Sequence, residues 1–155
     1  MSAVAAPRLA LSGHDLYLVR EGTHSRLYEK LGAHLVEGAT EFAVWAPNAA
    51  SIAVVGDFNG WDPRKHPLRQ TSDASGIWYG RVPEARQGSV YKYHIVSTHG
   101  GYRVDKADPY AFRCEMPPKT GSVVWDLDYD WHDGEWMRTR GRRNALHAPH
   151  AVYEG

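Results

Sequence analysis

The chain has 155 residues, which is enough for one ordinary domain with a substantial hydrophobic core. Its 18 basic and 18 acidic side chains cancel, so the overall charge does not favour binding to nucleic acid or to an anionic membrane. The single cysteine, Cys114, excludes an internal disulfide, is typical of a reducing cytoplasm, and is interpreted as a small core residue.

Residues 1–11 are small and apolar without a period, and we expect them to be disordered. No basic region precedes an apolar core there, and no later run approaches about 18 apolar residues. We therefore expect a cytoplasmic protein with neither a signal peptide nor a membrane partner. Six Trp and nine Tyr against three Phe favour surfaces that contact sugars or other half-polar partners.

Two short helices are predicted over residues 12–32. The first carries Leu16 and Val19 on one face and ends at Gly22, and Thr23 is the expected N-cap of the second. Beyond Gly38 the hydrophobic period changes to two. Strands are predicted at 41–46, 51–55, 76–82, 89–97, 102–104 and 122–125. Short strands with Pro, Gly and Asn between them predict an all-β fold, an immunoglobulin-like antiparallel β-sandwich over residues 33–126.

Residues 127–147 have no period and collect charge, so they are interpreted as a linker. Residues 148–155 read as the beginning of a further strand. A single terminal strand cannot bury both of its faces, so we expect a receiving part of the fold to be missing from this chain.

The segment Val54–Pro63 joins the second predicted strand to the rest of the sandwich, and it contains two turn signals, Asn59-Gly60 and Asp62-Pro63. These signals predict that Trp61 is held on a rigid loop. Two interpretations of Trp61 remain open: a plug of the hydrophobic core, or a flat platform that stacks on a ligand ring.

No catalytic or metal-binding pattern is present in the sequence. His147 and His150 are separated by Pro149, which disfavours the helix that would bring them together. The acids near Trp61 lack the glycine and the glutamate of a calcium loop, and no nucleotide-binding or nucleophile-elbow motif occurs. We therefore predict no catalytic residue, no metal and no cofactor.

Four further positions carry structural predictions. Trp45, Trp78 and Tyr91 alternate with small or polar residues along strands and are predicted to lie in the core. Asp108 precedes a proline, which predicts a tight turn at Asp108-Pro109-Tyr110.

Five motifs in order carry a resemblance to a known family: Arg26–His34 (RLYEKLGAH), Phe42–Ala49 (FAVWAPNA), Val54–Asp62 (VVGDFNGWD), Tyr91–Tyr93 (YKY) and Asp108–Phe112 (DPYAF). Over nearly the whole chain the sequence resembles the amino-terminal part of the bacterial 1,4-alpha-glucan (glycogen) branching enzymes. The resemblance implies that residues 33–126 form a carbohydrate-binding module of family 48, an early-set sandwich. It also implies that residues 148–155 are the first-strand stub of a catalytic (β/α)8 barrel, which is the expected partner. This chain alone is then expected to bind glucan without turning it over.

The resemblance also implies site residues. The family's glucan-binding positions match Trp61, Lys92 and Tyr102, and the expected ligands are alpha-1,4-glucans such as glycogen and maltooligosaccharides. Val124 stands where relatives place a sugar-bonding Asn, so we expect weak binding, with a dissociation constant of about 0.1 to 1 mM. Two alternatives are a stand-alone regulatory module that binds glycogen and a purely structural sandwich.

Overall fold

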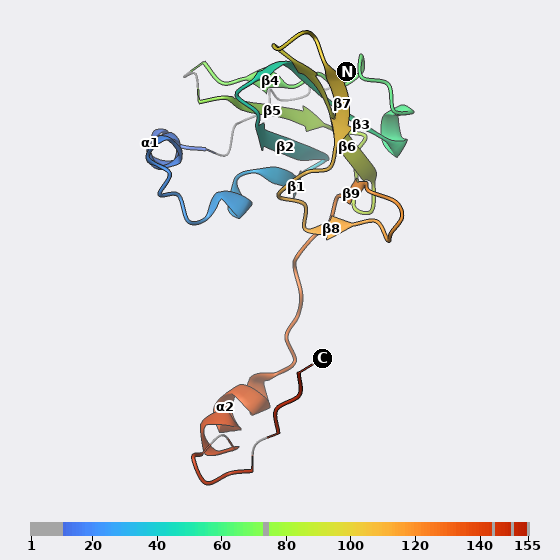
Figure 1. The fold of residues 1–155 in the computed structure, drawn as a ribbon. Helices are drawn as coiled ribbons and strands as arrows, with labels where there is room; N and C mark the ends of the chain where they lie inside the picture. The colour runs from blue at the N-terminus through green and yellow to red at the C-terminus, as the bar shows by residue number, and fades with distance from the viewer. Residues whose placement is uncertain (1–10, 73–74, 144, 150, 155) are drawn as a thin grey trace.

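A computed structural model of the chain describes residues 11–72, 75–143, 145–149 and 151–154 (Figure 1). Most of the predicted disordered segment, residues 1–10, lies outside these residues. Leu11 is described, and it is buried in a hydrophobic cluster with Leu31. The prediction of disorder is therefore wrong for Leu11, because its side chain has a packing partner that the local sequence does not reveal.

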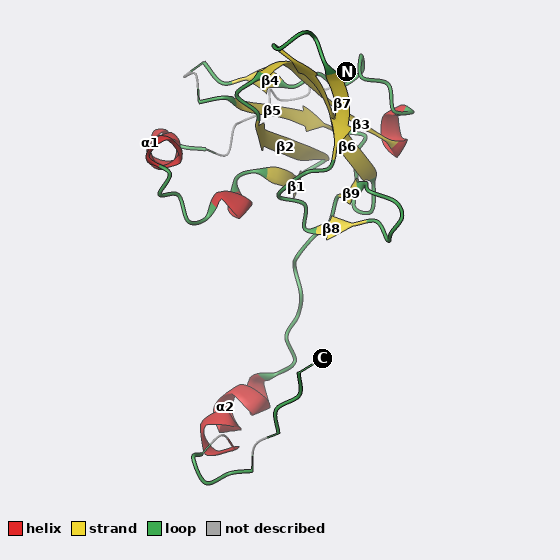
Figure 2. Ribbon diagram, viewed as in Figure 1, coloured by secondary structure: helices red, strands yellow, loops and turns green. Residues whose placement is uncertain are grey.

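Two antiparallel sheets face each other and form the predicted sandwich (Figure 2). The first sheet has the strand order β1 (Gly32–Val36), β2 (Ala39–Trp45), β5 (Ile77–Val82), β4 (Arg69–Gln70). The second has the order β3 (Ala49–Gly56), β6 (Val90–Ser97), β9 (Ser122–Val123), β8 (Arg113–Cys114), and β7 (Arg103–Lys106) also pairs with β6. The all-β, immunoglobulin-like fold class is confirmed.

Strands β2, β3, β5, β6, β7 and β9 correspond to the six predicted strands, whereas β1, β4 and β8 were not predicted. Gly32 was interpreted as the end of a helix, but it begins β1 with a φ of 101°. Strands β4 and β8 have two residues each, which is too short for any alternation to show. Cys114 lies in β8 and is exposed, so its assignment to the core is wrong. β8 is a two-residue strand at the edge of the sheet, and its side chains are not covered by the core.

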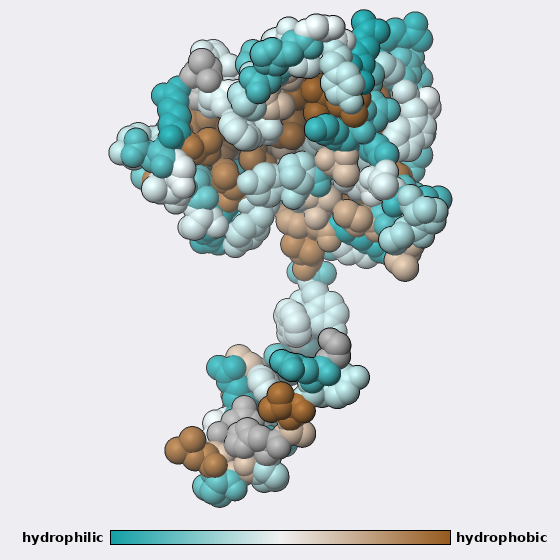
Figure 3. Space-filling model, viewed as in Figure 1, coloured by the Kyte–Doolittle hydropathy of each residue, from teal (hydrophilic) through white to brown (hydrophobic). Residues whose placement is uncertain are grey.

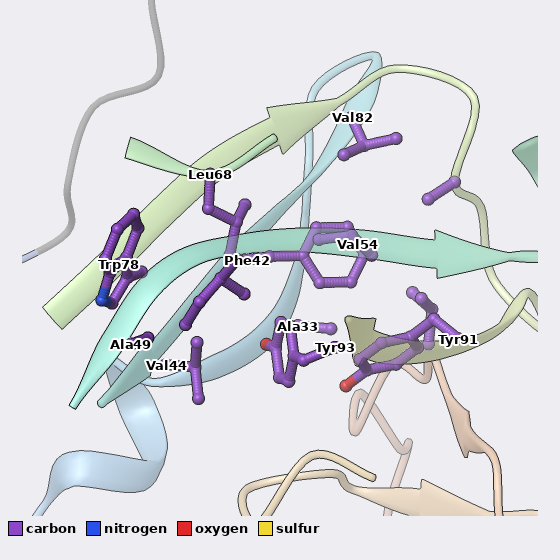
Figure 4. Packing of buried hydrophobic residues seen from close by; sticks show 13 residues of the cluster. Ala33, Phe42, Val44, Ala49, Val54, Leu68, Trp78, Val82, Tyr91 and Tyr93 are labelled. Atoms are coloured by element: carbon purple, nitrogen blue, oxygen red, sulfur yellow. The ribbon is translucent and has the colours of Figure 1, made fainter. Parts of the chain in front are cut away.

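Alternation along the strands builds the core between the sheets. Phe42 and Val44 of β2 meet Val54, Tyr91 and Tyr93 of the second sheet (Figure 4). The rings of Phe42 and Tyr91 are 5.0 Å apart at an angle of 71°, an edge-to-face contact that stabilises aromatic pairs.

Two of the three aromatic residues predicted to lie in the core, Trp78 and Tyr91, are buried as expected. Trp45 is 56% exposed, and its prediction is wrong. Side chains alternate between the two faces of a strand, and Val44 faces inward. The ring of Trp45, the next residue, therefore points to the opposite face. Its indole N–H donates to the carbonyl oxygen of Ser75 at 3.0 Å.

A second hydrophobic cluster covers the outer face of the first sheet, where α1 (Gly13–Glu21) and the 3-10 turn η1 (Leu27–Glu29) meet Ala43 and Ile77. Apolar surface gathers between α1 and the sandwich (Figure 3). Ser12 caps α1, because its hydroxyl accepts from the Asp15 N–H while the Asp15 carboxylate accepts from the Ser12 N–H. The second predicted helix is only the turn η1, and the N-cap expected at Thr23 is wrong, since η1 begins after Arg26 without a side-chain cap.

The predicted linker contains a helix, α2 (Gly134–Arg143), which lies apart from the sandwich in Figure 1. Glu135 stands in its first turn and arginines stand in its last turn, as the helix dipole favours. Residues 151–154, which were expected to begin a strand, have no regular secondary structure. A strand forms only where a neighbour accepts its backbone hydrogen bonds, and none of the described residues does so here.

Asp108 anchors the turn that follows β7, and the predicted turn is confirmed. The Tyr110 N–H donates to Asp108 Oδ1 at 2.8 Å. The carboxylate is only 5% exposed, and its Oδ2 accepts from the hydroxyls of Tyr91 at 2.7 Å and Tyr93 at 3.0 Å. The Asp108 N–H donates to the Ser122 hydroxyl at 2.8 Å. Burial raises the pKa of the Asp108 carboxyl above its usual value, although the bonds from Tyr91, Tyr110 and Tyr93 act in the opposite direction.

The raised pKa of Asp108 predicts a pH dependence of stability. The contribution of this group is fully present below the pKa of the unfolded chain, about 3.9, and is lost as the pH rises through the higher folded value. Asp108→Asn keeps a hydrogen-bond acceptor but does not titrate. We therefore expect the unfolding free energy of Asp108→Asn, relative to wild type, to increase between about pH 4 and pH 7 in urea titrations.

Asp108→Ala is the matched comparison. It leaves the buried hydroxyls of Tyr91 and Tyr93 without their acceptor, and we expect a loss of about 2 to 4 kcal/mol. A difference between Asp108→Asn and wild type that stays constant or decreases with rising pH contradicts the assignment of the titration to Asp108.

Candidate functional site

The loop after β3 is closed by the side chain of a buried asparagine. Asn59, at the end of the 3-10 turn η2 (Asp57–Asn59), donates through Nδ2 to the Val54 carbonyl oxygen at 2.9 Å. Its Oδ1 accepts from the Gly56 N–H at 3.0 Å. The same Nδ2 lies 2.9 Å from His66 Nδ1. The sequence predicts a turn at Asn59-Gly60, but it does not show that the amide of Asn59 ties the loop to the strand.

Trp61 lies at the tip of this loop with a φ of 60°, and among the described residues no other non-glycine residue has a positive φ. A bulky residue pays about 1–2 kcal/mol for this conformation. Gly60 beside it has a φ of 66° without that penalty, and the Trp61 N–H donates to the Gly56 carbonyl oxygen at 3.0 Å. The residue is 44% exposed. Trp61 is therefore not a core plug but an outward-facing side chain on a fixed backbone.

Close packing at the base of the loop explains why a glycine stands at position 56. A Cβ atom on Gly56 would lie 2.3 Å from the carbonyl oxygen of Val90 and 2.6 Å from the Phe58 ring. Beyond Trp61, the Arg64 guanidinium and N–H bind the Asp62 carboxylate and hold its pKa well below the usual range. The loop is thus restrained on both sides of Trp61.

Lys92 lies near the same end of the second sheet. The register of β3 and β6 places Lys92 opposite Val55 and Tyr91 opposite Gly56, the residue to which the Trp61 backbone is bonded. Lys92 Nζ donates to the Thr120 hydroxyl at 2.7 Å. The structure therefore brings the Trp61 loop and Lys92 to neighbouring positions. It adds Thr120, which the sequence did not single out because it stands outside any strand or motif.

Tyr102 is 64% exposed and lines a cavity to which neither Trp61 nor Lys92 contributes. This cavity of about 250 Å³ is formed with Pro47, Ile95 and Val104, among others. Side chains alternate along β6, so Ile95 points to the same inner face of the sheet as Tyr93. Lys92 points to the opposite, outer face. The structure thus separates Tyr102 from Lys92 across the sheet instead of joining them in one site.

Val124 also differs from expectation. It was expected on the sugar-binding surface in place of an Asn, but its side chain is completely buried in the core between the sheets. The backbone around it is fixed because the Val124 N–H donates to the Ser89 carbonyl oxygen at 2.9 Å. Position 124 is therefore a core position in this chain, and its side chain contributes nothing to a sugar-binding surface.

The described residues lack the features of two further kinds of function, metal binding and membrane spanning. No group of three or more His, Cys, Asp or Glu side chains there could hold a metal ion. None of the helices in this part of the chain has the length and hydrophobicity that crossing a bilayer requires. Aromatic surface and hydrogen-bonding groups are the chemistry that the Trp61 region offers.

The sequence of the chain is similar to known proteins. Residues 30–111 match the family described as carbohydrate-binding module 48 (isoamylase N-terminal domain). The chain is 56% identical over 144 residues to the 1,4-alpha-glucan branching enzyme GlgB of Albidiferax ferrireducens, which covers 92% of this chain and 23% of that protein. It is 48% identical over 148 residues to GlgB of Aquifex aeolicus, and that match covers 93% of this chain and 23% of that protein. The chain thus spans about a fifth to a quarter of the length of these relatives.

Solved structures show the same fold. The chain is similar to PulA of Klebsiella oxytoca with a TM-score of 0.54 and 29% identity, over 64% of this chain and 10% of that one. It is also similar to a Klebsiella pneumoniae pullulanase that was crystallised with maltotriose, with a TM-score of 0.53 and 27% identity. That second match likewise covers 64% of this chain and 10% of the other.

The role of Asn59 leads to a testable prediction. Asn59→Ala leaves the Gly56 N–H and the Val54 carbonyl without partners, so we expect a loss of about 2 to 4 kcal/mol in the free energy of unfolding. Urea unfolding followed by tryptophan fluorescence measures it. Asn48→Ala is the matched control, since that exposed asparagine contributes through its backbone carbonyl. Equal stability of the two variants contradicts the role of Asn59.

Proposed function

Because this chain belongs to the carbohydrate-binding module 48 family, we propose that it binds alpha-1,4-glucan through the surface formed by Trp61 and Lys92. The single observation that carries the proposal is the outward-facing Trp61 on its restrained loop. An apolar ring face presented by a restrained backbone suits the C–H face of a glucose unit, and little backbone order is lost on binding.

The polar groups of the proposed surface are Lys92 and Thr120, on the strand and loop that neighbour the Trp61 loop. Lys92 carries three N–H donors, of which one is used for Thr120. The ammonium group is then available to donate to sugar hydroxyls, and the Thr120 hydroxyl can both donate and accept. This combination of one aromatic face with a few convergent polar groups is typical of small-molecule sites. Tyr102, which lines another cavity, is not needed for this contact.

We further propose that the module serves a branching enzyme like the relatives that it matches, in which another part of the protein carries out the chemistry. A catalytic barrel following residue 155 is the expected partner. The chain by itself is proposed to bind linear glucan and to leave it unbranched.

The proposal predicts that Trp61→Ala weakens binding of maltoheptaose by at least about tenfold, which is about 1.4 kcal/mol. Lys92→Ala should weaken it about three- to tenfold through lost hydrogen bonds. Isothermal titration calorimetry and retardation in glycogen-containing gels measure both effects. Trp45→Ala removes an exposed tryptophan of the other sheet and is the matched control, with unchanged binding expected.

A structural role for Trp61 gives a different pattern. In that case Trp61→Ala lowers the unfolding free energy by about 3 kcal/mol or more while maltoheptaose binding stays the same. That result overturns the proposal. New alpha-1,6 branches formed by the isolated chain would overturn the proposed division of labour between binding and catalysis.

A further inference from the structure

A second cavity, here called the Trp125 cavity, lies at the far edge of the second sheet. It has a volume of about 390 Å³, and its lining includes three aromatic residues, Tyr28, Phe112 and Trp125, and two acidic ones, Glu29 and Asp126. Trp125 follows β9 and Phe112 precedes β8, whereas Trp61 follows β3 at the opposite end of the strand order. The two tryptophans therefore belong to different surfaces of the sandwich.

The aromatic rings of this cavity are held in place by neighbours. The Arg113 guanidinium carbon lies 3.9 Å from the centroid of the Trp125 ring, so one face of the indole is covered. Phe112 contacts the His34 ring edge-on, with centroids 5.5 Å apart. Tyr28 is 49% exposed at the rim. The cavity thus offers preformed aromatic surface, which a ligand can cover without first ordering it.

Two carboxylates, those of Glu29 and Asp126, contribute hydrogen-bond acceptors to the lining, which also contains His34 with its Nε2 bonded to the Leu31 carbonyl oxygen. Glu29 Oε1 accepts from Arg26, and Asp126 Oδ1 accepts from the Asp128 N–H at 2.9 Å. The Asp126 N–H donates to Gln87 Oε1 at 2.9 Å, which fixes the backbone there. Ionised carboxylates accept but do not donate, so they repel anions and bind groups that carry O–H or N–H donors.

From this lining we infer that the Trp125 cavity is a second saccharide site, which takes one or two glucose units of a neutral alpha-1,4-glucan. Sugar hydroxyls donate to the free oxygens of Glu29 and Asp126, while C–H groups of the ring contact Trp125 and Tyr28. The volume falls within the range of small-ligand pockets, about 300–1,000 Å³. This inference rests on the proposed glucan binding and adds a site to it.

The test uses the full chain labelled with nitrogen-15, in which six tryptophan indole N–H signals can be followed by NMR. Trp→Phe variants at positions 61 and 125 assign two of them. On titration with maltotriose, the Trp125 signal should shift saturably in wild type and equally in Trp61→Ala. Tyr28→Ala and Asp126→Ala should weaken the Trp125 response at least about fivefold and leave the Trp61 response unchanged. Tyr28 is half-exposed, so its variant is expected to fold.

The outcomes separate this inference from the proposed function. A Trp61 signal that shifts while Trp125 does not overturns the second site and leaves the first intact. If neither signal shifts, both the proposed glucan binding and the second site are wrong. N-acetyl-arginine amide serves as a cationic probe: if it alone moves Trp125, the cavity receives a basic side chain and the saccharide site is wrong.

Discussion

The alternation of side chains along β6 is the constraint on which the rest of the structure depends. Tyr91 and Tyr93 point inward, where their hydroxyls share one oxygen of the buried Asp108 and their rings pack on Phe42. These contacts fix the register of the strand, since a slip by one residue would expose both tyrosines and bury Lys92. Lys92 consequently faces outward because its two neighbours are held inward.

The loop that presents Trp61 follows from the same register. Gly56 ends β3 opposite Tyr91, and the space there excludes any larger side chain. Asn59 then bonds back to Val54 and Gly56, which offsets the cost of the positive φ at Trp61. A strained tryptophan that is neither buried nor mobile needs such compensation. The hydrogen bonds of Asn59 hold the backbone of the loop from which the exposed Trp61 side chain extends.

The sequence was informative where a repeating pattern spans several residues. The long strands and the inward Tyr91 follow from alternation, and the turn at Asn59-Gly60 follows from turn chemistry. The same turn chemistry left open whether the Trp61 side chain faces the core or the solvent. Prediction was wrong where parity alone decides the outcome, as for Trp45, because a two-residue period does not say which parity faces the core. Thr120, Val124 and Tyr102 depend on how distant segments meet, and no local pattern encodes that.

The placement of aromatic residues connects the fold to the use of a polymer as ligand. A single contact with a dissociation constant near 0.1 to 1 mM provides only about 4 to 5.5 kcal/mol, which is little for holding a large branched molecule. Glycogen offers many chain ends, so the second site that we propose would meet a polymer already held at the first at a high effective concentration. Two such sites reach an avidity well above either affinity without any new contact. Under the proposed function, aromatic surface at both ends of one sheet suits a polymeric ligand better than one deeper pocket, which would hold only one strand.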